Sequence, residues 1–247
     1  MDRTVLREDM VDSLQYEAKG FVRSDAVGLA MRTVPRHEFV AETEDAAYAD
    51  RTLERLGTRV LSPSTAARLL EALAPEPGDS TLVVGVGVGY TAAVVAEIAG
   101  QDVVQGVDIS RRLVYEARDN LDRAGYGGVL VDRRDGIHGL AEYAPYDRVL
   151  VEAAAVEPPR ALVDQLADDG RLVMPLGASE QSLVAVDADG EVTDRFGPVA
   201  FAPMLVEGEQ ADTVERNRTV REDREFAQRN THGRRGWEQD WIDWDSY

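Results

Sequence analysis

Three glycines at alternate positions, Gly85, Gly87 and Gly89, follow an apolar run rich in valine. Because glycine has no Cβ, a backbone of this kind lets a ligand approach closely. The run from Thr91 to Ala99 is compatible with a helix, whose first N–H groups and positive dipole end favour a polar or anionic group. The order of strand, glycine turn and helix therefore predicts a ligand site. The alternative is a simple tight turn at the end of a buried strand.

Acidic residues follow later apolar runs. Asp108 ends the next such run, about twenty residues after the glycine turn. In nucleotide-binding folds an acid at this spacing accepts hydrogen bonds from ribose hydroxyls. Asp135 and Glu152 come after two further runs of the same kind. In parallel sheets ligands bind at the carboxyl ends of the strands, so these acids and the glycine turn are candidates for one site. Asp108 could instead cap a helix before Ser110.

The elements that would position these residues alternate regularly. Apolar patterning predicts strands at 81–86, 102–107, 128–132, 147–152 and 171–175, and helices at 90–99, 110–123 and 158–167. Such alternation predicts an α/β fold with a doubly wound parallel sheet and helices on both faces. Two more strands, at 182–186 and 191–200, flank Asp189-Gly190, a hairpin signal.

The segment before the sheet is expected to be helical, at 5–19 and 24–33, and again from Ser62 to Leu73. Ser62 is suited to cap that last helix, with Pro63 in its first turn. We therefore predict an N-terminal helical region at 1–74, a ligand-binding domain at 75–207 and a charged C-terminal extension at 208–247.

The extension holds all three tryptophans of the chain, Trp237, Trp241 and Trp244. Their spacing places them on one face of a helix. This stripe could pack on the protein's own core, meet a second subunit in self-association, or belong to a free tail.

Composition excludes several classes of site. The chain has no cysteine, and its three histidines show no metal-ligand spacing, so we expect no metal. The formal net charge of −19 disfavours nucleic-acid binding. Such acidity is typical of halophilic proteins, because concentrated salt screens the repulsion between their negative charges. No apolar run is long enough to cross a bilayer and the first residues lack a signal-peptide core, so we expect a cytoplasmic protein without membrane contact.

Several strings, in order and in register, resemble the protein-L-isoaspartate O-methyltransferases, which are class I methyltransferases dependent on S-adenosylmethionine. The similar segments run over most of the chain, from about Val11 to Val206. They include residues 34–40 (VPRHEFV), 47–50 (AYAD), 84–93 (VGVGVGYTAA), 135–148 (DGIHGLAEYAPYDR), 170–177 (GRLVMPLG) and 201–204 (FAPM). The resemblance implies a Rossmann-like, seven-stranded doubly wound sheet.

The resemblance also implies roles for residues of the predicted site. Gly85, Gly87 and Gly89 would pass beneath the methionine part of the cofactor, with Tyr90 beside them. Asp108 would bind the ribose hydroxyls. Asp135 and Gly136 would meet the adenine edge, although Asp135 could instead be only a turn residue. The implied substrate is a damaged protein or peptide with an isoaspartyl residue.

Five positions depart from the family pattern, one of them Leu140, which stands where the family usually has a tryptophan. Arg59 and Leu61 stand where the substrate loop of the family has a threonine and its active serine, and Ser62 lies one position further on. Val83 replaces an acid two positions before the first glycine, and Glu152 replaces a threonine. A charge at Glu152 would oppose a carboxylate substrate unless Arg59 pairs with it or with the substrate.

Methyl transfer to a carboxylate needs little acid–base chemistry, because the acceptor is already a nucleophile and must mainly be held in line with the methyl group. We expect Arg59, Ser62 and the backbone near Ala153 and Ala154 to hold that carboxylate, with Arg59 and Ser62 as the catalytic residues. Three interpretations remain: an isoaspartyl methyltransferase, a methyltransferase of this lineage with another acceptor, and a degenerate binding homologue without catalysis.

Overall fold

The computed structural model describes residues 2–16, 20–40 and 44–206, all within one compact unit, Met1–Asp212. The predicted C-terminal extension with its tryptophan stripe lies outside the described residues. So does the end of the helix expected at 5–19. Every helix within the described ranges is too short or too polar to span a bilayer.

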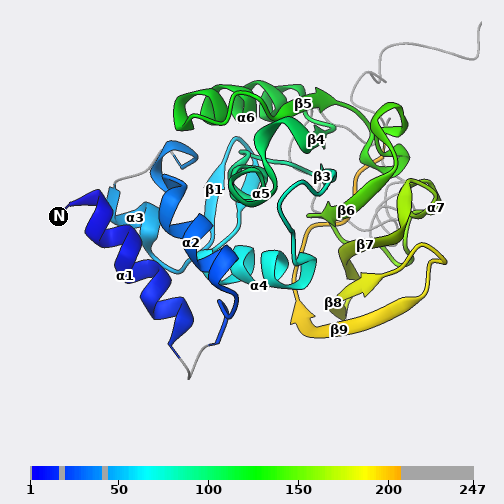
Figure 1. Ribbon diagram of the computed structural model, residues 1–247, viewed down its shortest axis with the longest axis horizontal. Helices are drawn as coiled ribbons and strands as arrows, with labels where there is room; N and C mark the ends of the chain where they lie inside the picture. The colour runs from blue at the N-terminus through cyan, green and yellow to red at the C-terminus, as the bar shows by residue number, and fades with distance from the viewer. Residues whose placement is uncertain (1, 17–19, 41–43, 207–247) are drawn as a thin grey trace, which may run out of the picture. The chain divides into compact units, whose positions relative to one another are not determined.

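A seven-stranded sheet forms the centre of this unit, in the order β5-β4-β3-β6-β7-β8-β9 (Figure 1). The strands are β3 (Thr81–Val84), β4 (Val104–Asp108), β5 (Leu130–Arg133), β6 (Tyr146–Val151), β7 (Leu166–Leu176), β8 (Gln181–Val186) and β9 (Val192–Val199). Neighbours from β5 to β7 pair in parallel, whereas β8 and β9 are antiparallel. The predicted doubly wound α/β sheet, with a closing hairpin around Gly190, is confirmed.

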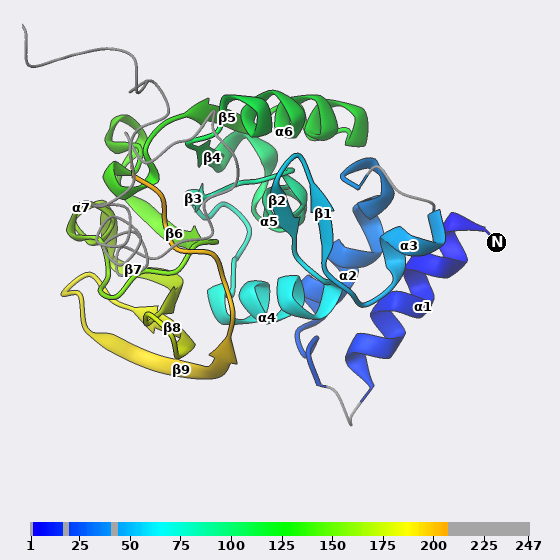
Figure 2. The same ribbon diagram turned by 180° about the vertical axis from the view of Figure 1, so that it is seen from behind.

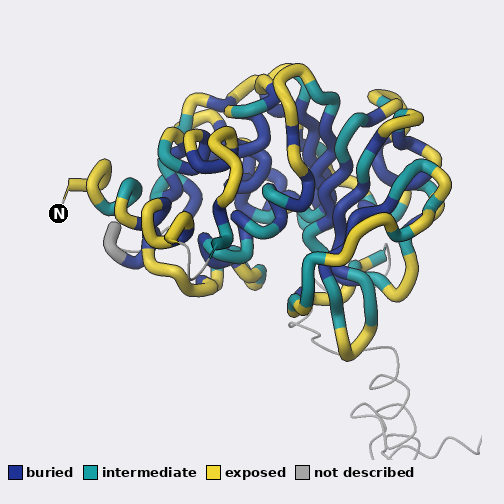
Figure 3. Tube along the Cα trace, turned by 60° about the horizontal axis from the view of Figure 1, so that its bottom comes forward, coloured by how far each residue is buried: buried dark blue, intermediate teal, exposed yellow. Residues whose placement is uncertain are grey.

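Alternate residues of the central strands enter two separate cores. In β3, Val83 packs with the N-terminal helices, α5 (Tyr90–Ala99) and α6 (Arg111–Ala124), whereas Leu82 and Val84 face the second core. The same period of two applies in β6, where Leu150 belongs to the first core and Val149 and Val151 to the second. These strands form the dark, buried centre of the tube in Figure 3. Two-sided burial explains why they read as continuous apolar runs.

The N-terminal helices share the first core with the sheet. They are α1 (Arg3–Gln15), α2 (Asp25–Thr33), α3 (Glu44–Tyr48) and α4 (Pro63–Leu73), with a short 3-10 turn, η1 (Arg36–Glu38). Figure 2 shows α1 and α3 on the side of this unit away from β7, β8 and β9. The boundary predicted near residue 74 falls between α4 and β3 and inside this continuous core.

The helix expected at 158–167 is much shorter than predicted. Only Arg160–Val163 is helical, as α7, and β7 begins at Leu166, five residues earlier than the expected strand. Leu166 pairs with Tyr146 in β6, and the Gln165 side chain binds the Leu140 N–H at 2.9 Å. These long-range interactions stabilise an extended conformation from Leu166 on, so the helix ends earlier than predicted. The second core is consequently covered by α7, through Leu162 and Val163, and by Leu140, which lies between two 3-10 turns, η3 (Gly136–His138) and η4 (Ala141–Tyr143).

A small hairpin before α4 is absent from the sequence prediction. It consists of β1 (Leu53–Arg55) and β2 (Thr58–Val60), joined at Leu56 and Gly57, both with positive φ. Leucine rarely adopts this conformation, so Leu56-Gly57 carries no usual turn signal. Arg55 ties the hairpin to α6 through its Nη2, which lies 2.6 Å from Oε1 of Glu116. The tertiary ion pair supports a turn that local preference does not favour.

Candidate active site

Four adjacent strand ends form one edge of the sheet. Asp135 follows β5, Asp108 ends β4, the glycine turn follows β3, and Glu152 follows β6. Because β5, β4, β3 and β6 are neighbours and run parallel, their carboxyl ends lie side by side. The structure therefore brings together the predicted glycines and all three predicted strand-end acids.

The glycine turn is hydrogen-bonded to β4 at its start and is open at Gly87. Gly85, Gly87 and Gly89 have φ of 78°, 56° and 93°. The Gly85 N–H donates to the Val107 carbonyl of β4 at 2.8 Å, which fixes the turn to the next strand. A Cβ at Gly89 would meet Leu121 at 3.3 Å, but one at Gly87 would meet only the Gly85 carbonyl oxygen, at 3.8 Å. Gly87 thus presents a bare backbone to the space above the sheet edge.

Asp108 links the glycine turn to the start of α6. Its Oδ2 accepts a hydrogen bond from the Gly87 N–H at 3.0 Å, and its Oδ1 accepts one from the Ser110 N–H at 2.8 Å. The residue is only 7% exposed, and burial raises the pKa of its carboxyl, although both N–H bonds oppose the rise. The capping alternative and the ligand hypothesis are compatible, because a carboxylate has about four acceptor positions and these bonds use two.

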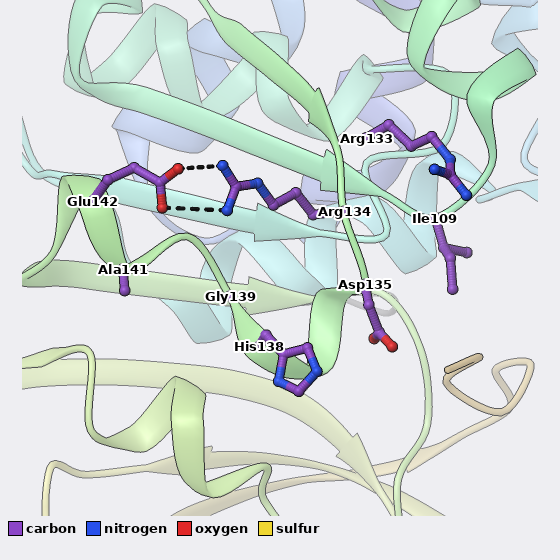
Figure 4. Close-up of a pocket in the computed structure, with 8 residues that line it drawn as sticks. All are labelled: Ile109, Arg133, Arg134, Asp135, His138, Gly139, Ala141 and Glu142. Atoms are coloured by element: carbon purple, nitrogen blue, oxygen red, sulfur yellow. Dashed lines mark hydrogen bonds and ion pairs between the residues drawn. The ribbon is translucent and has the colours of Figure 1, made fainter. Parts of the chain in front are cut away.

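A cavity of about 420 Å³ opens between the ends of β4 and β5 (Figure 4). Its lining comprises Ile109, Arg133, Arg134, Asp135, His138, Gly139, Ala141 and Glu142. Arg134 and Glu142 pair with each other on one side of it. Gly136 follows Asp135 and packs closely on β3. A Cβ at Gly136 would lie 2.4 Å from Cγ1 of Val84, so only glycine fits at this position. Asp135 also accepts a bond from the Ile137 N–H at 3.0 Å, as a turn residue does.

Glu152 lies on the other side of the glycine turn. Its carboxylate accepts a hydrogen bond from the Thr91 hydroxyl, in the first turn of α5. A Cβ placed on Gly85 would be 3.8 Å from that of Glu152. The residue as a whole is partly exposed, but its carboxyl group is buried in the protein. This burial raises the pKa of Glu152 to about 8, the Thr91 bond lowers it, and the nearby charge of Asp108 raises it further.

Tyr90 is placed differently from the other predicted cofactor residues. Its side chain is 3% exposed within the first core, where the Arg36 guanidinium lies 4.6 Å from the ring centroid. Phe39 packs edge-on against the same ring. The Tyr90 side chain therefore contacts the N-terminal motif, and only its backbone belongs to the glycine turn.

Comparison with known proteins identifies the family of this chain. The family model "Protein-L-isoaspartate(D-aspartate) O-methyltransferase (PCMT)" matches residues 6–210. The chain belongs to this family. A protein-L-isoaspartate O-methyltransferase of Methanopyrus kandleri is 42% identical over 209 residues, covering 81% of this chain and 92% of the relative. One of Aeropyrum pernix is 40% identical over 203 residues, covering 78% and 77%.

Solved structures show the same fold. A putative protein-L-isoaspartate O-methyltransferase from Plasmodium falciparum, in complex with S-adenosyl-L-homocysteine, superposes with a TM-score of 0.71 and 23% identity. The match covers 81% of this chain and 98% of that one. A second structure titled protein-L-isoaspartate O-methyltransferase has a TM-score of 0.72 and 26% identity, with coverage of 80% and 65%.

Arg36 is a functional candidate that the sequence prediction missed. It is fully buried, its Nε donates to the Ala47 carbonyl at 2.8 Å and its Nη2 to the Leu61 carbonyl at 2.5 Å. It thereby joins three strings that resemble this methyltransferase family: 34–40, 47–50 and the loop at 57–63. Burial lowers the pKa of its guanidinium, although Tyr90 and the charge of Asp50 oppose the decrease. The signal available in the sequence was an arginine between apolar residues of the VPRHEFV string.

In the substrate loop of this methyltransferase, Ser62 and Arg59 have different surroundings. Ser62 is the N-cap of α4, and its Oγ accepts a bond from the Thr65 N–H at 3.2 Å. Arg59 is exposed on β2, opposite Glu54 in the hairpin register. Within the described residues no hydrogen bond or ion pair joins Arg59 to Ser62 or to Glu152. The capping role expected for Ser62 is confirmed, and the catalytic roles stay predictions.

Proposed function

We propose that this chain transfers a methyl group from S-adenosylmethionine to the carboxyl group of isoaspartyl residues in damaged proteins. The observation that carries the proposal is the family match over residues 6–210. The glycine turn, Asp108 and the neighbouring cavity at the carboxyl edge of the sheet support the proposal.

The residues at this edge fit the cofactor. The cavity of about 420 Å³ beside Ile109 and Asp135 has room for an adenine ring. Buried Asp108 keeps acceptor positions for ribose hydroxyls. The open backbone at Gly87 allows close approach of the methionine part. When bound, the cofactor supplies a methyl group activated by a sulfonium charge.

The remaining work of this chain is positional. An isoaspartyl carboxylate is already a nucleophile, so no general base is required, and the rate depends on alignment and on exclusion of water. Arg59 is suited to this task, because a guanidinium binds a carboxylate through two hydrogen bonds. The contact must orient the carboxylate without neutralising it, since tighter binding of the ground state does not accelerate transfer. Ser62 is the weaker candidate, because it is only 8% exposed and its hydroxyl already lies 2.9 Å from Oγ1 of Thr65 and 3.1 Å from Oγ of Ser64.

The test uses radiolabelled S-adenosylmethionine with an isoaspartyl peptide and its aspartyl counterpart. We propose a cytoplasmic location for the protein. Its net charge of −19 is typical of adaptation to concentrated salt, so the assay is run in molar KCl. Label should enter only the isoaspartyl peptide. Arg59→Ala should lower kcat/KM at least about tenfold, or 1.4 kcal/mol, with unchanged cofactor affinity. Ser62→Ala should have a smaller effect.

Arg195→Ala is the matched control, because Arg195 is also an exposed arginine on a strand, in the edge strand β9. Equal activity of the parent and Arg59→Ala proteins would remove Arg59 from the site. Cofactor binding without any methylation of the isoaspartyl peptide would refute the proposed acceptor.

One observation favours a second candidate, a methyltransferase of this lineage with another acceptor. Leu61 stands where the family has its active serine, and its carbonyl is bound by Arg36. A leucine side chain offers no hydrogen bond to a substrate. Methylation of another carboxylate in the same assay, with none of the isoaspartyl peptide, would establish this function instead.

A further inference from the structure

Glu152 stands at the ligand edge, and no step of the proposed transfer uses it. We propose, on the basis of the proposed function, that Glu152 binds the ammonium group at the methionine end of S-adenosylmethionine. This role would make Glu152 a binding and positioning residue of the active site.

The order of the strand ends locates that end of the cofactor. The cavity lies between β5 and β4, Asp108 is on β4, the glycine turn is on β3, and Glu152 is on β6. A cofactor with adenine in the cavity and ribose at Asp108 extends along this edge over the glycine turn. Its remaining part then reaches the end of β6. Glu152 is close to the turn there, as the 3.8 Å from a Cβ at Gly85 indicates.

The chemistry of the carboxylate selects the ammonium group. Glu152 accepts one hydrogen bond, from Thr91, and within the described residues no arginine or lysine forms an ion pair with it. A carboxylate has about four acceptor positions, so most of its capacity is unused. An ammonium group has three N–H donors and a positive charge, which make short charge-assisted bonds. The sulfonium carries charge but has no such donor.

The electrostatic surroundings predict a measurable consequence. The pKa of Glu152 is about 8 because the carboxyl is buried. Asp108 on β4 is the charged group that acts on it and raises the pKa, and α5 contributes only the neutral Thr91 hydroxyl. Val84 and Val151 are paired in the strands beside it. The free protein therefore holds Glu152 largely protonated at pH 7, and a bound ammonium would favour the ionised form and release the proton.

Titration calorimetry of the whole protein with S-adenosylmethionine, in buffers of different ionisation enthalpy, measures this release. At pH 7 the parent protein should release up to about 0.9 proton per cofactor bound, the fraction protonated at a pKa of about 8. Affinity should rise by up to about tenfold from pH 6 to pH 7. Affinities are compared only between pH 6 and pH 7, because the α-amino group of the cofactor itself loses its proton near pH 8.

Glu152→Gln keeps an acceptor for Thr91 but cannot ionise. It should abolish the proton release and the pH dependence, and weaken binding at pH 7 at least tenfold. Glu191→Gln removes the same charge from an exposed residue between β8 and β9, at the opposite end of β8 from the ligand edge, and should behave as the parent. S-adenosylhomocysteine, which retains the ammonium and lacks the sulfonium charge, should release a proton to the same extent.

The outcomes separate this inference from the proposed function. Parent protein that binds the cofactor without proton release, or Glu152→Gln protein that retains both the affinity and the release, overturns the role of Glu152 alone. Release with S-adenosylmethionine but not with S-adenosylhomocysteine overturns the assignment to the ammonium group. Absence of any cofactor binding by the parent overturns the proposed function and this inference together. The parent measurement needs no variant, so it decides even if a substitution impairs folding.

Discussion

Glu152 should reduce the stability of the cofactor-free protein as the pH rises, and Glu152→Gln should remove that loss. The ordinary pKa of a glutamate is 4.5, and folding raises that of Glu152 to about 8. The folded state therefore binds the proton more tightly than the unfolded state. The stability this contributes is complete below pH 4.5, is lost progressively as the pH rises from 4.5 to 8, and is absent above pH 8.

The size of the effect follows from the two pKa values. Ionising the buried carboxyl should lower the free energy of unfolding by about 1 kcal/mol at pH 5, about 3 kcal/mol at pH 7 and about 5 kcal/mol at pH 9. The glutamine of the Glu152→Gln variant would keep the acceptor for Thr91 and carry no charge at any pH. The variant should therefore gain stability relative to the parent by roughly these amounts over the same range.

Urea denaturation at a series of pH values, at constant salt and without cofactor, measures the difference. Glu191→Gln is the control, because an exposed glutamate loses no solvation on folding and its difference from the parent should stay nearly constant. A difference between Glu152→Gln and the parent that did not change between pH 5 and pH 9 would refute the burial of this carboxyl. Unequal denaturant slopes would indicate a change in the unfolded or native state instead.

Three further substitutions test the rest of the site. Gly87→Ala should lower the free energy of unfolding by only about 1–3 kcal/mol, because alanine is strained at the positive φ of this position. It should nevertheless reduce the affinity for S-adenosylmethionine more than tenfold in calorimetry, since the added Cβ would enter the open space that the ligand is proposed to occupy. Unchanged affinity would place the cofactor elsewhere. Asp108→Asn should weaken cofactor binding by about 1–3 kcal/mol, the usual loss for bonds to a charged group, and equal binding would exclude the ribose role. Arg36→Met leaves the carbonyls of Ala47 and Leu61 without their donor, so thermal unfolding should show a loss of about 2 kcal/mol or more. The methylation assay should show a larger loss than cofactor titration, and a melting temperature equal to the parent's would contradict the joining role of Arg36.

The sequence alone determined the sheet and the positions of its polar strand ends. Each central strand is a short apolar run that both cores bury, and each is followed within a few residues by a glycine or an acid. Such signals are local, so Gly87, Asp108 and Asp135 could be placed at one edge once the strands were predicted to be parallel. Ser62 before Pro63 likewise marks the start of α4 by local chemistry alone.

The tertiary structure decided what those residues experience. The helix expected at 158–167 ends early because Leu166 pairs with Tyr146 in a neighbouring strand, and the Leu56 turn persists because Arg55 reaches Glu116 on α6. The sequence showed only that Glu152 is an acid that departs from the family pattern. Its raised pKa depends on enclosure by the packed strands and on Thr91, a residue 61 positions away in the chain. Burial and hydrogen-bond partners arise from contacts between distant segments, which no local pattern of residue types encodes.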